Sequence, residues 1–135
     1  MKTALLDTDT LSYFLKGDEA VAAKTQAYLR IYERLNISTI TYYEILGGLE
    51  YKSATQQIIK FQNFIEKCSL FNLTLASLEI SAQIFGNLKQ KGITIGTTDL
   101  LIAGIAIEHR FQLITNNEKH FHAIEGLDVD NWMKG

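Results

Sequence analysis

Apolar and polar residues alternate along the chain in two patterns, one typical of short buried strands and one typical of helices. Short apolar runs between polar residues indicate strands, and apolar residues three and four apart indicate helices packed on a core. The predicted strands are 3–6, 36–40, 70–75, 111–115 and 127–129. The predicted helices are 11–15, 19–36, 42–49 (interrupted by Gly47 and Gly48), 55–68, 78–88 after a Ser77 cap, 99–109 and a short turn at 118–121. This alternation predicts a three-layer α/β domain with a mostly parallel sheet.

Composition fits a single globular domain spanning residues 1–135, with 47% apolar and 21% charged residues. The longest apolar run, residues 100–107, is too short to cross a bilayer, and the N-terminus lacks the apolar stretch of a secretory signal. The single cysteine, Cys68, excludes an internal disulfide. We therefore expect a cytoplasmic protein with no membrane partner.

Asp7 follows the first predicted strand, at the edge where open α/β sheets bind their ligands. An ordinary explanation is that an acid here caps the next helix. Thr8, Asp9 and Thr10 can already cap that helix, so Asp7 is one acid more than capping requires. Asp9 is expected to cap or to support Asp7.

Glu44 has two explanations. Thr41 and Glu44 fit a capping box, in which the glutamate bonds back to the amide of the cap residue. Alternatively, Glu44 lies in the first turn after a strand, as Asp7 does, and faces the same edge of the sheet.

Asp99 begins a helix that is apolar on almost every side and must be buried. An acid in a first turn gains about 0.3–1 kcal/mol from the helix dipole. Desolvating a carboxylate costs several kcal/mol, and Thr97 or Thr98 could cap the helix without a charge. A nearby cation would offset the burial of Asp99.

Asn116 and Asn117 follow the strand 111–115, where amides are ordinary turn residues. If that strand lies beside the first, Asn117 and Asp7 flank the same crevice. Carboxylates converging there would repel one another, and oxygen ligands of this type suit Mg²⁺ or Mn²⁺. The spacing of the histidines does not suit zinc, and two of them are expected on the surface beside the crevice. These are His120 and His122; the third is His109.

Four segments resemble the PIN-domain ribonucleases, and most closely the VapC-type toxins of bacterial toxin–antitoxin pairs. They are Leu-Leu-Asp-Thr-Asp-Thr-Leu at 5–11, Thr-Tyr-Tyr-Glu-Ile-Leu-Gly-Gly-Leu at 41–49, Ile-Gly-Thr-Thr-Asp-Leu-Leu-Ile-Ala at 95–103 and Leu-Ile-Thr-Asn-Asn-Glu-Lys-His-Phe at 113–121. The resemblance implies strand order 3-2-1-4-5, Mg²⁺- or Mn²⁺-dependent cleavage of RNA, a homodimer, and inhibition by a small antitoxin. The family's fourth acid is here Asn117, which implies one tightly bound metal ion and a weaker second.

On this hypothesis Asp7, Glu44 and Asp99 hold the ion and, with Asn117, form the catalytic group. Three neighbouring residues are candidates to support these side chains or to contact phosphate: Thr8, Thr115 and Asn116. Five basic residues could follow the RNA backbone, or could simply be solvated: Lys16, Arg30, Arg34, Lys89 and Lys91. The formal charge of −2 makes nucleic-acid binding dependent on such local cations and on metal.

Two other functions compete with this hypothesis. Asp7-Thr8-Asp9 matches the Asp-x-Asp start of haloacid-dehalogenase-type phosphatases, although Leu11 stands where those enzymes have threonine. The missing fourth acid also suits a PIN fold that binds partners without catalysis.

Overall fold

The computed structural model describes residues 1–134 and places five short strands in one sheet. The strands are β1 (Ala4–Leu6), β2 (Asn36–Ser38), β3 (Ser69–Phe71), β4 (Gln112–Ile114) and β5 (Val129–Asp130). Their order is β3-β2-β1-β4-β5, and every neighbouring pair is parallel. Leu6 at the end of β1 pairs with Ile37 on one side and Ile114 on the other. The α/β class and the strand order predicted from the sequence are confirmed.

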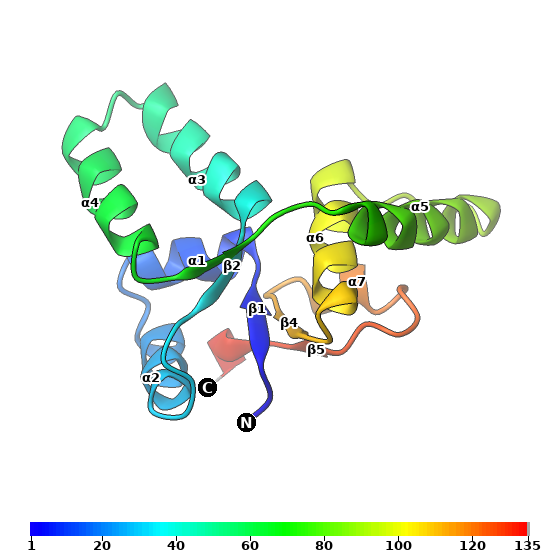
Figure 1. Ribbon diagram of the computed structural model, residues 1–135, viewed down its shortest axis with the longest axis horizontal. Coiled ribbons are helices and arrows are strands. Elements are labelled where there is room, and N and C mark those ends of the chain that lie inside the picture. Colours follow the sequence, from blue (N-terminus) through cyan, green and yellow to red (C-terminus); the bar gives the residue numbers. More distant parts are fainter. Residues whose placement is uncertain (135) are drawn as a thin grey trace.

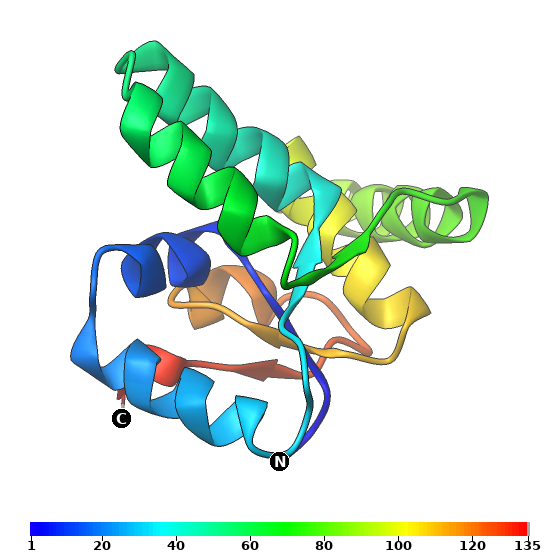
Figure 2. The same ribbon diagram turned by 60° about the vertical axis from the view of Figure 1, so that its left-hand side comes forward.

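Helices connect the strands and cover both faces of the sheet (Figures 1 and 2). They are α1 (Thr8–Leu15), α2 (Glu19–Leu29), α3 (Thr39–Tyr51), α4 (Thr55–Ile65), α5 (Leu75–Gln90), α6 (Thr97–Glu108) and α7 (Glu118–Phe121), followed by a 3₁₀ turn at Trp132–Lys134. Because successive side chains of a strand point to opposite faces, Leu5 and Leu6 enter different cores. Leu6 packs in a cluster with residues of α1, α2 and α4, whereas Leu5 packs in a cluster dominated by α6.

Two helical pairs extend from this sandwich. The antiparallel helices α3 and α4 project away from the sheet, and α5 lies outside α6 (Figures 1 and 2). The contact between α5 and α6 is close because α6 carries Gly104, where an added Cβ would meet the Ser81 hydroxyl oxygen at 2.0 Å. Within the described residues, every helix is too short or too polar to traverse a lipid bilayer.

Several predicted helix starts were wrong because the residue that caps each helix was misassigned. Asp7 caps α1, so this helix begins at Thr8 and not at residue 11. Ser38 caps α3, which begins at Thr39 and passes through Gly47 and Gly48 without a break. Thr74 caps α5, and Ser77 is the third residue of that helix and completes a capping box. A hydroxyl or carboxylate one turn earlier thus extends each helix towards its strand.

Other boundaries also differ from the prediction. Helix α2 ends at Leu29 and turns occupy the residues that were assigned to its last part, while β3 ends at Phe71 because the chain then enters the α5 cap. Helix α4 ends at Ile65, and α6 begins two residues earlier than expected, at Thr97. The short turn α7 lies at residues 118–121 as predicted.

Candidate active site at the carboxyl edge of the sheet

Asp7 lies directly beyond β1, and its side chain is 5% exposed. Its Oδ1 accepts a hydrogen bond of 2.8 Å from the Thr10 amide, and its own amide donates to the Ile114 carbonyl on β4. Burial raises the pKa of Asp7 from 3.8 to about 6, although hydrogen bonds from Thr115 and Thr10 oppose this shift. The expectation that Asp7 is not needed as a cap is therefore wrong, since Asp7 is the cap. Capping alone does not require such deep burial.

Glu44 is held across the start of α1 by a threonine. The Thr8 hydroxyl donates to Glu44 Oε1 at 2.6 Å and lies 3.0 Å from the Thr41 hydroxyl. The capping-box interpretation of Glu44 is wrong because Ser38 caps α3, which places Glu44 in the second turn of that helix. Its carboxylate is thus turned towards the residue that follows Asp7, and is free of the helix backbone.

Asp99 lies in the first turn of α6, whose N-cap is Gly96 with no side-chain cap bond. Burial raises the pKa of Asp99, and the nearby negative charges of Glu44 and Asp9 raise it further. His120 opposes this shift, because its Nε2 lies 3.1 Å from Asp99 Oδ2. These contributions place Asp99 at the start of α6 near Asp9 of the first turn of α1 and Glu44 of the second turn of α3.

The loop after β4 joins this group through Thr115. The buried Thr115 side chain lowers the pKa of Asp7, and its hydroxyl accepts a hydrogen bond of 3.0 Å from the Asn117 amide. Asn117 is the N-cap of α7, and its exposed side chain makes no capping bond. Asn116 Oδ1 accepts a hydrogen bond from Asn131 Nδ2 at 3.1 Å, and its role as a supporting or phosphate-contact residue stays a prediction.

The structure therefore arranges the predicted residues as linked pairs at one edge of the sheet. Thr115 lowers the pKa of Asp7 and accepts from the Asn117 amide, Thr8 donates to Glu44, and the negative charge of Glu44 raises the pKa of Asp99. Among residues 1–134, no three His, Cys, Asp or Glu side chains are already grouped so that they could hold one ion. Mg²⁺ is usually held by one or two carboxylates together with water and substrate phosphates, so such a group is not required. The all-oxygen donors and their mutual repulsion fit a divalent cation of this kind.

His120 was not predicted as a site residue, and the expectation that it lies only on the surface beside the crevice is incomplete. It is half-buried and contacts Asp99, whereas His122 is exposed. The available signal was its position three residues after Asn117 in a helical turn, which puts both residues on one side of the turn.

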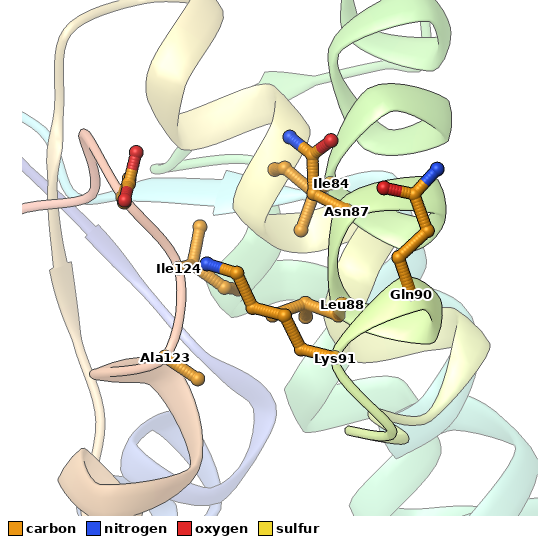
Figure 3. Close-up of a pocket in the computed structure, with 8 residues that line it drawn as sticks. Ile84, Asn87, Leu88, Gln90, Lys91, Ala123 and Ile124 are labelled. Atoms are coloured by element: carbon orange, nitrogen blue, oxygen red, sulfur yellow. The ribbon is translucent and has the colours of Figure 1, made fainter.

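Two hollows lie on other parts of the surface, and none of the four predicted site residues lines either of them. One has a volume of about 280 Å³ and lies between the end of α5 and residues 123–125, with Leu88 and Ile124 among its lining residues and Lys91 beside them (Figure 3). The other is a groove of about 530 Å³ between α1, α3 and α4. Its lining includes the apolar residues Leu15, Ile45, Leu49 and Phe61 and the lysines Lys16, Lys52 and Lys60.

Arg34, one of the candidate RNA-contacting residues, has a structural role in the folded chain. Its guanidinium donates hydrogen bonds to the main-chain carbonyls of Glu66 and Cys68, at 2.6 and 2.9 Å. It therefore joins the turn before β2 to the end of α4.

The family model described as PIN domain matches residues 4–127, a range that holds Asp7, Glu44, Asp99 and Asn117. The chain therefore belongs to the PIN-domain family. It is 39% identical over 102 residues to Ribonuclease VapC1 of Rickettsia felis, covering 73% of this chain and 76% of that protein. It is also 27% identical over 130 residues to the tRNA(fMet)-specific endonuclease VapC of Salmonella typhimurium, covering 95% and 96%. Within the family its relatives are thus VapC proteins, as the sequence motifs predicted.

Two of the solved structures that resemble this chain are VapBC complexes. The VapBC2 complex from Rickettsia felis bound to a DNA fragment from its promoter matches with a TM-score of 0.88 and 27% identity, over 96% of this chain and 98% of the other. The DNA-bound VapBC from Salmonella typhimurium matches with a TM-score of 0.87 and 27% identity, over 98% and 99%.

Proposed function

We propose that this chain is a divalent-metal-dependent endoribonuclease and the toxin of a toxin–antitoxin pair, with Asp7, Glu44 and Asp99 as its acidic centre and Asn117 beside them. The observation that carries this proposal is the burial of Asp7, whose pKa is raised to about 6 at an edge where Glu44 and Asp99 repel each other. A protein gains no stability from such an arrangement. Perturbed carboxylates of this kind are typical of functional sites.

Asp7, Glu44 and Asp99 would hold the metal ion, directly or through water. Mg²⁺ or Mn²⁺ would supply an activated water and neutralise charge on the phosphoryl oxygens of RNA. The residues around the acids hold them in place: the Thr8 hydroxyl donates to Glu44 and the Thr10 amide donates to Asp7. Asn117 adds an amide without a fourth negative charge, which lowers the repulsion that an incoming phosphate meets.

A transfer RNA is the first substrate to test, because the Salmonella relative is named as a tRNA(fMet)-specific endonuclease. With a net charge of −2, the chain has no general attraction for nucleic acid. Selectivity for a folded RNA would then depend on loop shape and on the metal site, and not on a basic surface.

The groove between α1, α3 and α4 suits the antitoxin. It is lined by apolar side chains together with Lys16, Lys52 and Lys60, which favours an apolar segment flanked by acidic residues. Helices α1 and α3 also carry Thr8 and Glu44, so a partner lying in the groove is next to the acids. The structural relatives from Rickettsia felis and Salmonella typhimurium were solved as VapBC complexes.

Helix α5 suits a second copy of the chain, which the homodimer prediction requires. Leu75 and Phe85 are 79% and 54% exposed, and Leu78 is also exposed between them. These residues lie on one face of a helix that stands outside α6 (Figure 1). Contiguous apolar surface of this kind is typical of a protein interface.

Inducible expression in a bacterial host tests the proposed function. We expect the wild-type chain to arrest growth with cleavage of cellular RNA, and the Asp7→Asn chain to permit growth. Asp18→Asn is the matched control, because Asp18 caps α2 as Asp7 caps α1. Growth arrest that Asp7→Asn does not relieve would contradict catalysis by the acids. If neither chain affects growth and purified protein with Mn²⁺ leaves RNA intact, the non-catalytic binding module is the better account.

The PIN-domain match over residues 4–127 argues against the phosphatase alternative, because that class of phosphatase belongs to a different family. The Asp-x-Asp start at Asp7 and Asp9 is then a part of the PIN-domain motif.

A further inference from the structure

The short helix α7 brings a side chain to the acids that the proposed function does not use. His120 Nε2 lies 3.1 Å from Asp99 Oδ2, although the two residues are 21 positions apart in the sequence. Both side chains are partly buried, at 26% and 39% exposure. The contact joins α7, which follows β4, to the first turn of α6.

The imidazole of His120 is held in place by its surroundings. Its ring packs edge-on against Phe121, with ring centroids 5.3 Å apart and planes at 87°, and Phe121 is buried in the core. The His120 amide donates to the Asn117 carbonyl at 3.1 Å. One helical turn therefore sets the positions of both Asn117 and His120.

The direction of the hydrogen bond follows from the ionisation of Asp99 and the tautomer of His120. When Asp99 is ionised its carboxylate only accepts, and the tautomer of His120 that carries hydrogen on Nε2 donates to Asp99 Oδ2. A donor on Oδ2 stops the carboxylate from rotating and leaves Oδ1 for another partner. Carboxylates that bind metal ions are commonly oriented by such hydrogen bonds from a neighbouring residue.

We infer that His120 is a positioning residue that holds the Asp99 carboxylate in the orientation in which it binds a divalent cation. This inference rests on the proposed metal site and adds a residue to it. The alternative is that His120 competes with the cation. In that case the imidazole occupies the position of the ion and must move away before the ion binds. The two roles predict changes of opposite sign when the imidazole is removed.

Mn²⁺ binding to the purified full-length chain distinguishes the two roles, measured from the electron paramagnetic resonance signal of free Mn²⁺. We expect His120→Ala to weaken Mn²⁺ binding about tenfold. His120→Gln, whose amide N–H can donate in place of Nε2, is expected to bind within about threefold of wild type. His122→Ala is the matched control in the same turn, with an exposed histidine, and is expected to bind as wild type does.

Unfolding in EDTA separates positioning from a structural role. Because the pair is partly exposed, His120→Ala is expected to unfold within about 2 °C of wild type when no metal is present. Mn²⁺ binding by His120→Ala that equals or exceeds wild type would overturn the inference, and so would binding by His120→Gln as weak as that of His120→Ala. If wild type itself binds no Mn²⁺, the proposed function fails instead.

Discussion

At the scale of single residues, Asp7 works against the stability of the fold. Burial raises its pKa from 3.8 to about 6, so the folded chain favours the protonated carboxyl group more than the unfolded chain does. For an acid whose folded-state pKa is raised, the stabilisation is complete below pH 3.8 and is lost as the pH rises through about 6. The difference corresponds to roughly 3 kcal/mol. A cation beside the acid would restore that stability at neutral pH.

Replacing Asp7 by asparagine is therefore expected to stabilise the metal-free chain at neutral pH while abolishing its nuclease activity. Asparagine caps a helix about as well as aspartate and has no charge to desolvate. At pH 7.5 in EDTA we expect Asp7→Asn to raise the free energy of unfolding by about 2 kcal/mol and the melting temperature by roughly 6 °C. Urea and thermal unfolding measure both quantities.

The pH dependence provides the internal control. Near pH 4 the advantage of Asp7→Asn is expected to vanish, because the wild-type carboxyl group is then protonated in the folded chain. Asp18→Asn changes a less buried cap and should give no comparable gain at any pH. Equal stability of wild type and Asp7→Asn at pH 7.5 would show that the burial of Asp7 carries no electrostatic cost.

Thr8 gives a second prediction, because its hydroxyl is the donor that holds Glu44 at 2.6 Å. Thr8→Val keeps the shape of the side chain and removes the donor, and we expect RNA cleavage to fall about tenfold. Thr8→Ser keeps the hydroxyl and should retain most of the activity. Initial cleavage rates of the two variants are compared with wild type, and equal rates for Thr8→Val would exclude a positioning role for Thr8.

The acids were easier to predict from the sequence than the residues that form hydrogen bonds with them. Asp7 and Asp99 could be found because each is an acid beside an apolar segment that must be buried, which is a local signal. The Thr8 bond to Glu44 and the His120 bond to Asp99 join residues 36 and 21 positions apart, and only the folded chain brings them together. Whether these acids form the catalytic centre remains a prediction until it is tested.

At the scale of elements, α6 depends on its close contact with α5. The Ser81 hydroxyl donates to the Leu100 carbonyl of α6, and a Cβ at Gly104 would also meet the Ser77 carbonyl oxygen at 2.6 Å. The position of α6, which carries Asp99, therefore depends on Gly104 in α6 and on Ser77 and Ser81 in α5.

Gly104→Ala is expected to destabilise the fold by about 3 kcal/mol, because the helices must separate to admit the methyl group. Gly86→Ala on α5 is the matched control, since an added Cβ there meets no atom within 4 Å. That control should stabilise the fold by about 0.5–1 kcal/mol through helix propensity. Chemical denaturation measures both variants, and a Gly104→Ala chain as stable as wild type would contradict the close contact.

Element types were predicted well and element ends poorly, for a physical reason. Apolar residues recur at the spacing of the face that each element buries. Each of the five strands and seven helices in residues 1–134 was therefore predicted close to its observed position. The ends depend on which of several adjacent polar residues caps the helix. Ser38 and Thr41 are equivalent candidates in the sequence, as are Thr74 and Ser77, and only backbone geometry selects between them.

At the scale of the whole molecule, the groove shares α3 with Glu44, whereas the exposed face of α5 lies on an element that carries none of the acids. The strand order was predicted from a family resemblance and is confirmed, while the dimer was predicted in the same way and stays a prediction. The reason is that strand order is a property of one chain, whereas association needs a second copy.

The exposed face of α5 makes the dimer testable. Phe85→Asp places a charge on the proposed interface and is expected to raise the dimer dissociation constant at least about thirtyfold. Ile59→Asp is the matched control, because Ile59 on α4 is 54% exposed, as is Phe85. Sedimentation equilibrium measures both, and a Phe85→Asp chain that associates as wild type does would place the interface elsewhere.

The central claim is that Asp7, Glu44 and Asp99 act together as one metal-dependent centre that cuts RNA. The most direct test is cleavage of a transfer RNA by purified chain with Mn²⁺ or with EDTA, for wild type and for Asp7→Asn, Glu44→Gln and Asp99→Asn. We expect cleavage by wild type that EDTA abolishes, a loss of at least about a hundredfold in each variant, and full activity in the exposed-acid control Glu79→Gln. Wild-type cleavage that persists in EDTA, or that survives any one of the three substitutions, would contradict the account.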